Sequence, residues 1–267
     1  MERLFRITLL LLLLCMPVNI FAAEELHAIK EKETTSVLYE RAIRLFTQKI
    51  PETFEKRLSN SNKYIDLVME IFNEKNIPLD IAYLPLIESG FSPLSVGRGG
   101  TVGLWQFVKG TAKRYGLKVD SYVDERKDPV KSTEAAARYL RDLYRIFGSW
   151  DVALAAYNAG DGKVKRMRSN RSFIRFPKFI NSYLAKFMAA STVAQDPESF
   201  GFATVEDTED ETPDVVEITT TGITSLKAIA GRYDTTVRAI KDLNPALCTN
   251  YTPPYRYVLR LPDRQGF

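Results

Sequence analysis

The chain has 267 residues and a net charge of +4, with 45% apolar and 26% charged residues. This length suggests one or two domains, and the composition excludes wholesale disorder. The small net charge gives no argument for binding nucleic acid, so no such partner is expected. A single histidine, His27, excludes multi-histidine metal sites, and two distant cysteines exclude zinc ribbons and iron–sulfur cages.

The first 23 residues have the pattern of a secretory signal peptide. Arg3 and Arg6 precede an apolar run over 7–15, and small residues ending at Ala23 precede two acids. The run is too short to cross a bilayer as a stable helix, so a retained membrane anchor is the less favoured alternative. Lipidation at Cys15 is also less favoured, because a bulky leucine precedes it. We therefore expect an exported protein of the periplasm or cell envelope.

Residues 24–60 are expected to form a charged helical arm that packs on the next domain. The following stretch, 61–202, has no alternating β pattern of any length and is predicted to be one all-α domain. Within it, Asp151 is expected to cap a helix, and Ile146 to lie on the buried face of the helix before it. The expected helices cover 64–72, 78–89, 129–147, 152–158 and 181–194.

The helix expected over 78–89 is apolar nearly all round, which predicts burial. Pro78 is expected in its first turn, Pro85 is expected to kink it, and Gly90 ends it. Glu88 lies at its end. Because burial disfavours a charged carboxylate and raises its pKa, Glu88 is a candidate general acid. The alternative is a structural acid that caps or pairs within the fold, which is the usual role of a lone glutamate near a helix end.

A glycine-rich loop over 97–103 follows, with several positions free to take positive φ. It leads to Gln106, an amide between two large aromatic residues, of which Phe107 is assigned to core packing. Tyr157 and Asn158 place a phenol and an amide at a later helix end. Aromatic rings beside amides suit sugars. The loop is not a phosphate cradle, because the order of lysine and glycine after it is wrong for one.

A second carboxylate is needed for standard glycoside hydrolysis. Asp80, Asp151 and Asp161 are the candidates, but none falls within the cluster of motifs. This absence favours a mechanism with one acid/base and a nucleophile that the substrate supplies.

The amino-acid composition changes after residue 202. Residues 203–214 are acidic and include a proline, which predicts an exposed linker. Residues 215–263 are expected to form a small α+β module in the order strand, helix, helix, strand.

Six motifs in order resemble the soluble-lytic-transglycosylase (SLT) domain family, in the form found in membrane-bound lytic murein transglycosylase D. The resemblance covers about 60–202, and it implies a lysozyme-like α fold. The implied activity is cleavage of the MurNAc-β-1,4-GlcNAc bond in peptidoglycan glycan strands. The motifs are LPLIESGF (84–91), GLWQF (103–107), YGL (115–117), VDERKDP (123–129), AYNAG (156–160) and YLAKFMAA (183–190).

The resemblance implies a role for each matching residue. Glu88 would be the single catalytic acid/base, and it would leave 1,6-anhydroMurNAc ends. No metal or organic cofactor is implied. The residues implied in substrate binding are Ser89, Gln106, Tyr157, Asn158 and Tyr183.

The sequence departs from the family pattern in two regions. Gly97 stands where the family usually has a serine that supports the catalytic glutamate, and Thr101 stands where it has an alanine. Phe179 and Ile180 replace a Glu-Thr pair. These changes motivate one alternative function, a catalytically silent wall-binding or scaffold protein. A lysozyme-type hydrolase of the same polymer is the other alternative.

In the C-terminal module, Gly222-Ile223-Thr224 stands in place of a Gly-Asp-Thr motif, and further positions fit the LysM pattern: Leu226, Ile229-Ala230, Tyr233, Leu243-Asn244 and Leu259-Arg260-Leu261-Pro262. The module therefore resembles a degenerate LysM domain, whose family role is to bind N-acetylated glycan. A packing lid for the catalytic domain is the alternative.

Overall fold

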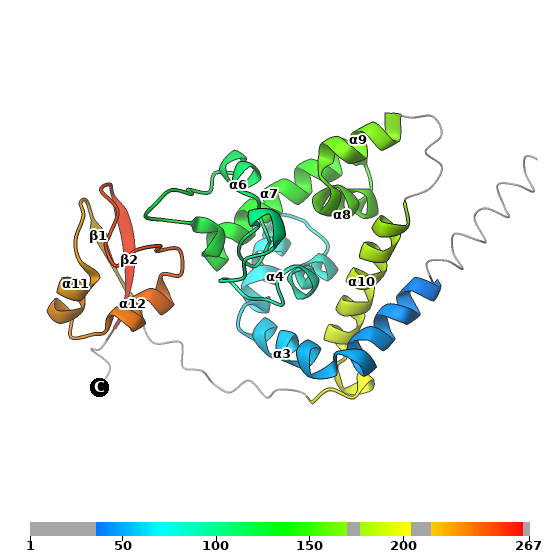
Figure 1. Ribbon diagram of the computed structural model, residues 1–267, viewed down its shortest axis with the longest axis horizontal. Coiled ribbons are helices and arrows are strands. Elements are labelled where there is room, and N and C mark those ends of the chain that lie inside the picture. Colours follow the sequence, from blue (N-terminus) through cyan, green and yellow to red (C-terminus); the bar gives the residue numbers. More distant parts are fainter. Residues whose placement is uncertain (1–35, 170–176, 204–214, 264–267) are drawn as a thin grey trace, which may run out of the picture.

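The computed structural model describes residues 36–169, 177–203 and 215–263 (Figure 1). Within them the fold is mainly helical with one small two-stranded sheet, as predicted. The expected signal peptide (1–23) and all but the first residue of the expected linker (203–214) lie outside the described residues.

The described part of the N-terminal arm is helical but not one continuous helix. An α-helix over 36–44 runs into a π-helical turn, η1 (Leu45–Lys49), and the chain breaks at Ile50 before α3 (Pro51–Asn62). Phe46 and Phe54 stack across this break with ring centroids 4.3 Å apart. Both rings are buried, so the arm packs on the helical core.

The helix expected over 78–89 is two short helices, which corrects the prediction. After α4 (Ile65–Glu74), the chain forms a 3₁₀ helix, η2 (Leu79–Tyr83), and then α5 (Pro85–Glu88). Pro78 is extended and precedes η2 (φ −54°, ψ 129°), and Pro85 starts α5 rather than kinking a longer helix. Proline suits this first position because it has no N–H to satisfy.

The long helix α7 (Pro129–Phe147) confirms its predicted ends. The carboxylate of Asp128 accepts a hydrogen bond from the Lys131 N–H at 3.0 Å, and Gly148 ends the helix in the left-handed region (φ 74°). Two details were wrong. Ile146 is 49% exposed. The N-cap position of α8 (Trp150–Ala159) is Ser149, whose side chain makes no capping hydrogen bond, and Asp151 lies in the first turn.

Other described elements complete the helical body. The sequence analysis did not predict α6 and α9, and α10 begins three residues earlier than expected. Their bounds are η3 (Arg98–Gly100), α6 (Lys109–Arg114), η4 (Glu125–Lys127), α9 (Asp161–Ser169), α10 (Lys178–Gln195) and η5 (Glu198–Phe200).

The C-terminal module (residues 215–263) has the predicted order of elements. Strand β1 (Val215–Thr220) pairs antiparallel with β2 (Tyr257–Pro262), with α11 (Leu226–Arg232) and α12 (Val237–Leu243) between them. Figure 1 shows the module beside the helical body. Its hydrophobic core is separate from the main core but includes fully buried Val123, which comes from the helical body.

Candidate active site

Glu88 is the last residue of α5, and α3 holds this end of the helix in place. Arg57 donates a hydrogen bond to the Leu86 carbonyl at 3.1 Å, and Asn60 donates one to the Gly90 carbonyl at 2.9 Å. Gly90 has φ +63°, and a Cβ there would lie 2.7 Å from Cγ of Arg57. Glycine is therefore required for α3 to approach so closely.

The hydroxyl of Ser89 makes a hydrogen bond within the protein. It donates to the Leu104 carbonyl at 2.8 Å, which ties the end of α5 to the loop after it. Ser89 does not line the cavity described below. It positions the backbone beside Glu88.

The loop over 97–107 turns on glycines, as predicted. Gly99, Gly100 and Gly103 all have positive φ, and a Cβ on Gly103 would lie 1.8 Å from the Arg126 carbonyl oxygen. Gln106 also has positive φ, at 48°. Its side-chain amide donates to the Gly103 carbonyl at 2.8 Å, which holds the turn closed.

The departures at Gly97 and Thr101 are linked in space. The Thr101 hydroxyl donates to Oε1 of Gln106 at 2.7 Å. A Cβ on Gly97 would lie 2.4 Å from that hydroxyl oxygen and 2.3 Å from the same Oε1. The threonine and glutamine side chains thus occupy the space that a serine at position 97 would need.

Tyr157 joins α8 to the same loop. Its hydroxyl donates to the Trp105 carbonyl at 2.7 Å, and its ring lies 5.2 Å from that of Tyr139 on α7. Trp105 is fully buried and donates its indole N–H to Thr133, so this side chain belongs to the core.

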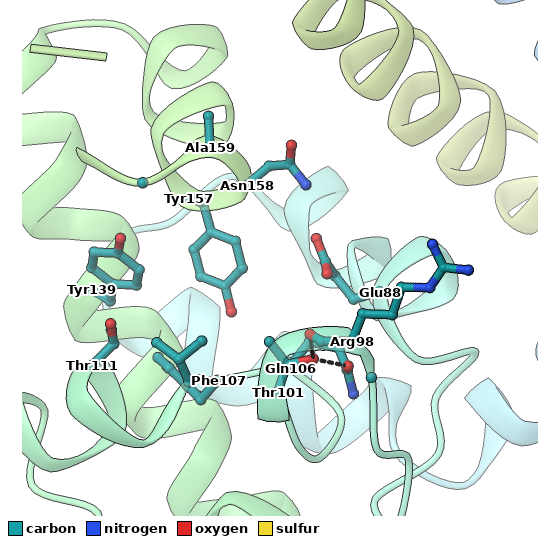
Figure 2. Close-up of a pocket in the computed structure, with 13 residues that line it drawn as sticks. Glu88, Arg98, Thr101, Gln106, Phe107, Thr111, Tyr139, Tyr157, Asn158 and Ala159 are labelled. Carbon is teal, nitrogen blue, oxygen red and sulfur yellow. Dashed lines mark hydrogen bonds between the residues drawn. The ribbon is translucent and has the colours of Figure 1, made fainter. Parts of the chain in front are cut away.

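These elements enclose a cavity of about 520 Å³ (Figure 2). Four of the predicted site residues line it: Glu88, Gln106, Tyr157 and Asn158. Phe107, which was assigned to the core, is 3% exposed and also lines the cavity. Among the described residues, Glu88 is the only carboxylate in the lining.

Tyr183, on α10, contacts Glu88 directly. Its hydroxyl donates to Oε1 of Glu88 at 2.6 Å, although the two residues are 95 positions apart. Burial raises the pKa of Glu88, and this hydrogen bond opposes that rise. Burial, followed by the charge of Glu88, raises the pKa of Tyr183 well above its usual value, so the phenol stays a donor.

The candidate second carboxylates lie elsewhere. Asp80 accepts a hydrogen bond from Gln195 at 2.8 Å, Asp161 pairs with Lys165 at 3.4 Å, and Asp151 is exposed in the first turn of α8. None of them lines the cavity. Within the described ranges, no group of three His, Cys, Asp or Glu side chains could hold a metal ion.

Sequence reasoning missed several lining residues. Tyr139 lies on the buried face of α7 with 7% of its surface exposed, and a hydrophobic pattern does not register its hydroxyl. Thr101 was noted only as a departure, and Arg98 only as part of the loop. All three line the cavity, as does Thr111.

Comparison with known proteins agrees with this geometry. Residues 69–179 match the family model of the transglycosylase SLT domain. The chain contains an SLT domain. The predicted family resemblance and the lysozyme-like fold are therefore confirmed.

Several curated relatives are similar to part of this chain. Membrane-bound lytic murein transglycosylase D of Escherichia coli K12 is 31% identical over 138 residues, which are 48% of this chain and 30% of the relative. A putative tributyltin chloride resistance protein of an Alteromonas species is 33% identical over 42% of this chain and 55% of its own length. Peptidoglycan transglycosylase gp16 of phage T7 is 33% identical over 43% of this chain and 9% of its own length. The chain thus covers less than two thirds of each of these relatives.

Proposed function

We propose that the chain is a peptidoglycan lytic transglycosylase that cleaves the MurNAc-β-1,4-GlcNAc bond with Glu88 as its single acid/base. The observation that carries the proposal is the placement of Glu88 in an SLT domain. It is a half-buried carboxyl with a raised pKa and the only cavity-lining carboxylate among the described residues. A carboxyl of this kind can hold a proton near neutral pH and give it to a leaving group.

The proposed reaction has two proton transfers. Glu88 first protonates the glycosidic oxygen, the bond from that oxygen to C1 of MurNAc breaks, and GlcNAc leaves. The Glu88 carboxylate then takes the proton of the MurNAc C6 hydroxyl, and the oxygen of that hydroxyl bonds to C1. The 1,6-anhydro ring forms, no water is consumed, and Glu88 is protonated again. Tyr183 stabilises the carboxylate between the two steps by its hydrogen bond.

The remaining predicted site residues contact the sugar, support the protein around Glu88, or do both. We assign Gln106 and Asn158 to contacts with sugar hydroxyl and acetamido groups, because both line the cavity. The Tyr157 hydroxyl is already bonded to the protein, so its ring would face the sugar while its hydroxyl holds the loop. Tyr183 acts on Glu88 itself, and Ser89 keeps the supporting role described above.

Product mass after incubation with peptidoglycan tests the proposal. The wild-type chain is expected to release fragments one water lighter than hydrolytic fragments. Glu88→Gln should lower the rate by about 10³-fold or more, since a positioned acid/base contributes about 10²–10⁴-fold. Fragments with reducing ends would instead identify a lysozyme-type hydrolase.

A silent wall-binding protein is the second candidate, and one observation favours it. Phe179 is 45% exposed with the Lys163 ammonium 4.2 Å from its ring centroid, and Ile180 is buried, so neither supplies the polar groups of the family pattern. Binding to sacculi without any product, by a folded wild-type chain, would favour this candidate.

The cellular setting of the chain is also part of the proposal. We infer export to the periplasm or cell envelope from the signal-peptide pattern at 1–23, with peptidoglycan as the partner that an SLT domain implies. None of the helices in the described ranges has both the length and the apolar composition to span a membrane. The domain boundaries predicted from the sequence, and a LysM-like glycan-binding role for residues 215–263, belong to the same proposal.

A further inference from the structure

The segment 118–128, here called the brace segment, lies between the C-terminal module and the cavity loop (97–107). On one side it pairs with the module. The Asp124 N–H donates to the Ala246 carbonyl at 2.8 Å, and the Cys248 N–H donates to the Tyr122 carbonyl at 2.8 Å. Val123 between them completes the core of the module.

Side chains strengthen this junction. The Tyr255 hydroxyl donates to Asp120 at 2.6 Å, and the Lys118 ammonium lies 3.5 Å from the centroid of the same tyrosine ring. Arg260 lies 3.7 Å from the Asp128 carboxylate, which also caps α7. The module and the brace segment are thus joined by backbone, apolar and polar contacts together.

On its other side, the brace segment holds the cavity loop through one buried side chain. Arg126 is 7% exposed. Its Nη1 donates to the Gly100 carbonyl at 2.9 Å and to the Phe107 carbonyl at 3.0 Å. These two carbonyls lie on the two arms of the loop, and Gly103 at its turn packs against the Arg126 backbone.

The direction of the Arg126 guanidinium is set by Asp124. Its Nε and Nη2 donate to the two carboxylate oxygens of Asp124 at 2.8 and 2.7 Å, which is a bidentate pair of fixed geometry. The backbone of Asp124 is itself bonded to the module. A continuous chain of contacts therefore runs from Ala246 through Asp124 and Arg126 to the loop that lines the cavity.

We propose that the C-terminal module positions the cavity loop, with Arg126 as the positioning residue that connects them. The module is then part of the catalytic unit. The effect of this positioning on catalysis rests on the function proposed above. Its effect on the order of the cavity loop does not depend on that function. Loosening either end of the chain of contacts should release the same loop.

Two variants test the two ends in the full chain. Arg126→Lys keeps the charge beside Asp124 but cannot reach both carbonyls. Its matched control is Arg168→Lys, because Arg168 also donates to a backbone carbonyl (Phe147, 2.8 Å) but touches neither the loop nor the module. At the module end, Tyr255→Phe/Arg260→Gln removes polar contacts to the brace segment. Its control makes the same changes at exposed positions of the module, Tyr251→Phe/Arg256→Gln.

Hydrogen–deuterium exchange without substrate is the deciding measurement. The amides of Val102, Gly103 and Phe107 donate hydrogen bonds within or beside the loop, so they report its order. Both test variants are expected to speed their exchange about tenfold or more while amides of α7 stay protected, and both controls should leave them unchanged. Unchanged loop exchange in Arg126→Lys overturns the proposal. Loop release in that variant alone overturns the part assigned to the module.

Activity gives the second measurement. In both test variants the rate of release of 1,6-anhydro products should fall mainly through kcat, with a smaller change in KM, because the loop is misplaced around Glu88. Loss of activity without faster loop exchange overturns the proposal. If the wild-type chain releases no such product, the proposed function fails, and the exchange measurement still decides the positioning role.

Discussion

Burial of Glu88 links the proposed chemistry to the stability of the fold. Its pKa in the folded protein lies above its usual value. A group shifted in this direction contributes its full stability below the unfolded pKa, and that contribution is lost as pH rises through the folded pKa. The wild-type protein should therefore lose stability from this group between acidic and neutral pH.

Glu88→Gln should remove that loss. We expect the variant to be more stable than the wild type at pH 7, with the difference shrinking as pH falls to about 4. Gln Oε1 can still accept the hydrogen bond of Tyr183. Denaturant unfolding of both proteins between pH 4 and 8 measures the difference. A constant difference across this range would contradict the shifted pKa.

Tyr183→Phe tests the hydrogen bond from the other side. This bond lowers the pKa of Glu88, so its removal should raise that pKa further. The rate of a reaction that needs protonated Glu88 would then decline at a higher pH than in the wild type. A pH–rate profile of product release measures the shift. Tyr64→Phe, a change at a phenol outside the cavity lining, is the control and should leave the profile in place.

At the scale of the element, the cavity loop depends on the pairing of Gly97 with Thr101. Gly97 has extended backbone (φ −99°, ψ 179°), which serine can adopt, so only space forbids a side chain. We expect Gly97→Ser to cost about 1–3 kcal/mol of unfolding free energy, as overpacking usually does. Adding Thr101→Ala should recover only part of that loss, because Oε1 of Gln106 still lies in the same space. A double-mutant cycle by denaturant unfolding measures the coupling, and additive effects would contradict the shared space.

Helix ends could be predicted from local sequence signals, whereas contacts between distant elements could not. Asp128 and Gly148 fixed the ends of α7 because capping is decided within one turn. The apolar run over 78–89 did not reveal that two helices meet there, because a proline such as Pro85 can either kink one helix or start a new one. The contact of Tyr183 with Glu88 joins α10 to α5, which no local pattern encodes. Only the family resemblance led to Tyr183.

At the scale of the whole molecule, Val123 links the helical body to the hydrophobic core of the module. It belongs in sequence to the helical body and in space to the core of the module, where it is fully buried. Val123→Ala removes two buried methyl groups and is expected to cost about 2 kcal/mol. Thermal unfolding followed by calorimetry should show one lowered transition for the whole chain. A separate early transition of the module would contradict this coupling.

The junction at Tyr255 and Asp120 sets an order of events during synthesis. These two residues are 135 positions apart, so their contact cannot form until the chain has been made as far as Tyr255. Contacts between such distant positions form late because a long loop must first close, and a growing chain folds from its N-terminal end. The helical body can therefore assemble around Glu88 while its cavity loop still lacks outside support. The loop would gain the support of the brace segment only after the chain has been made as far as Tyr255.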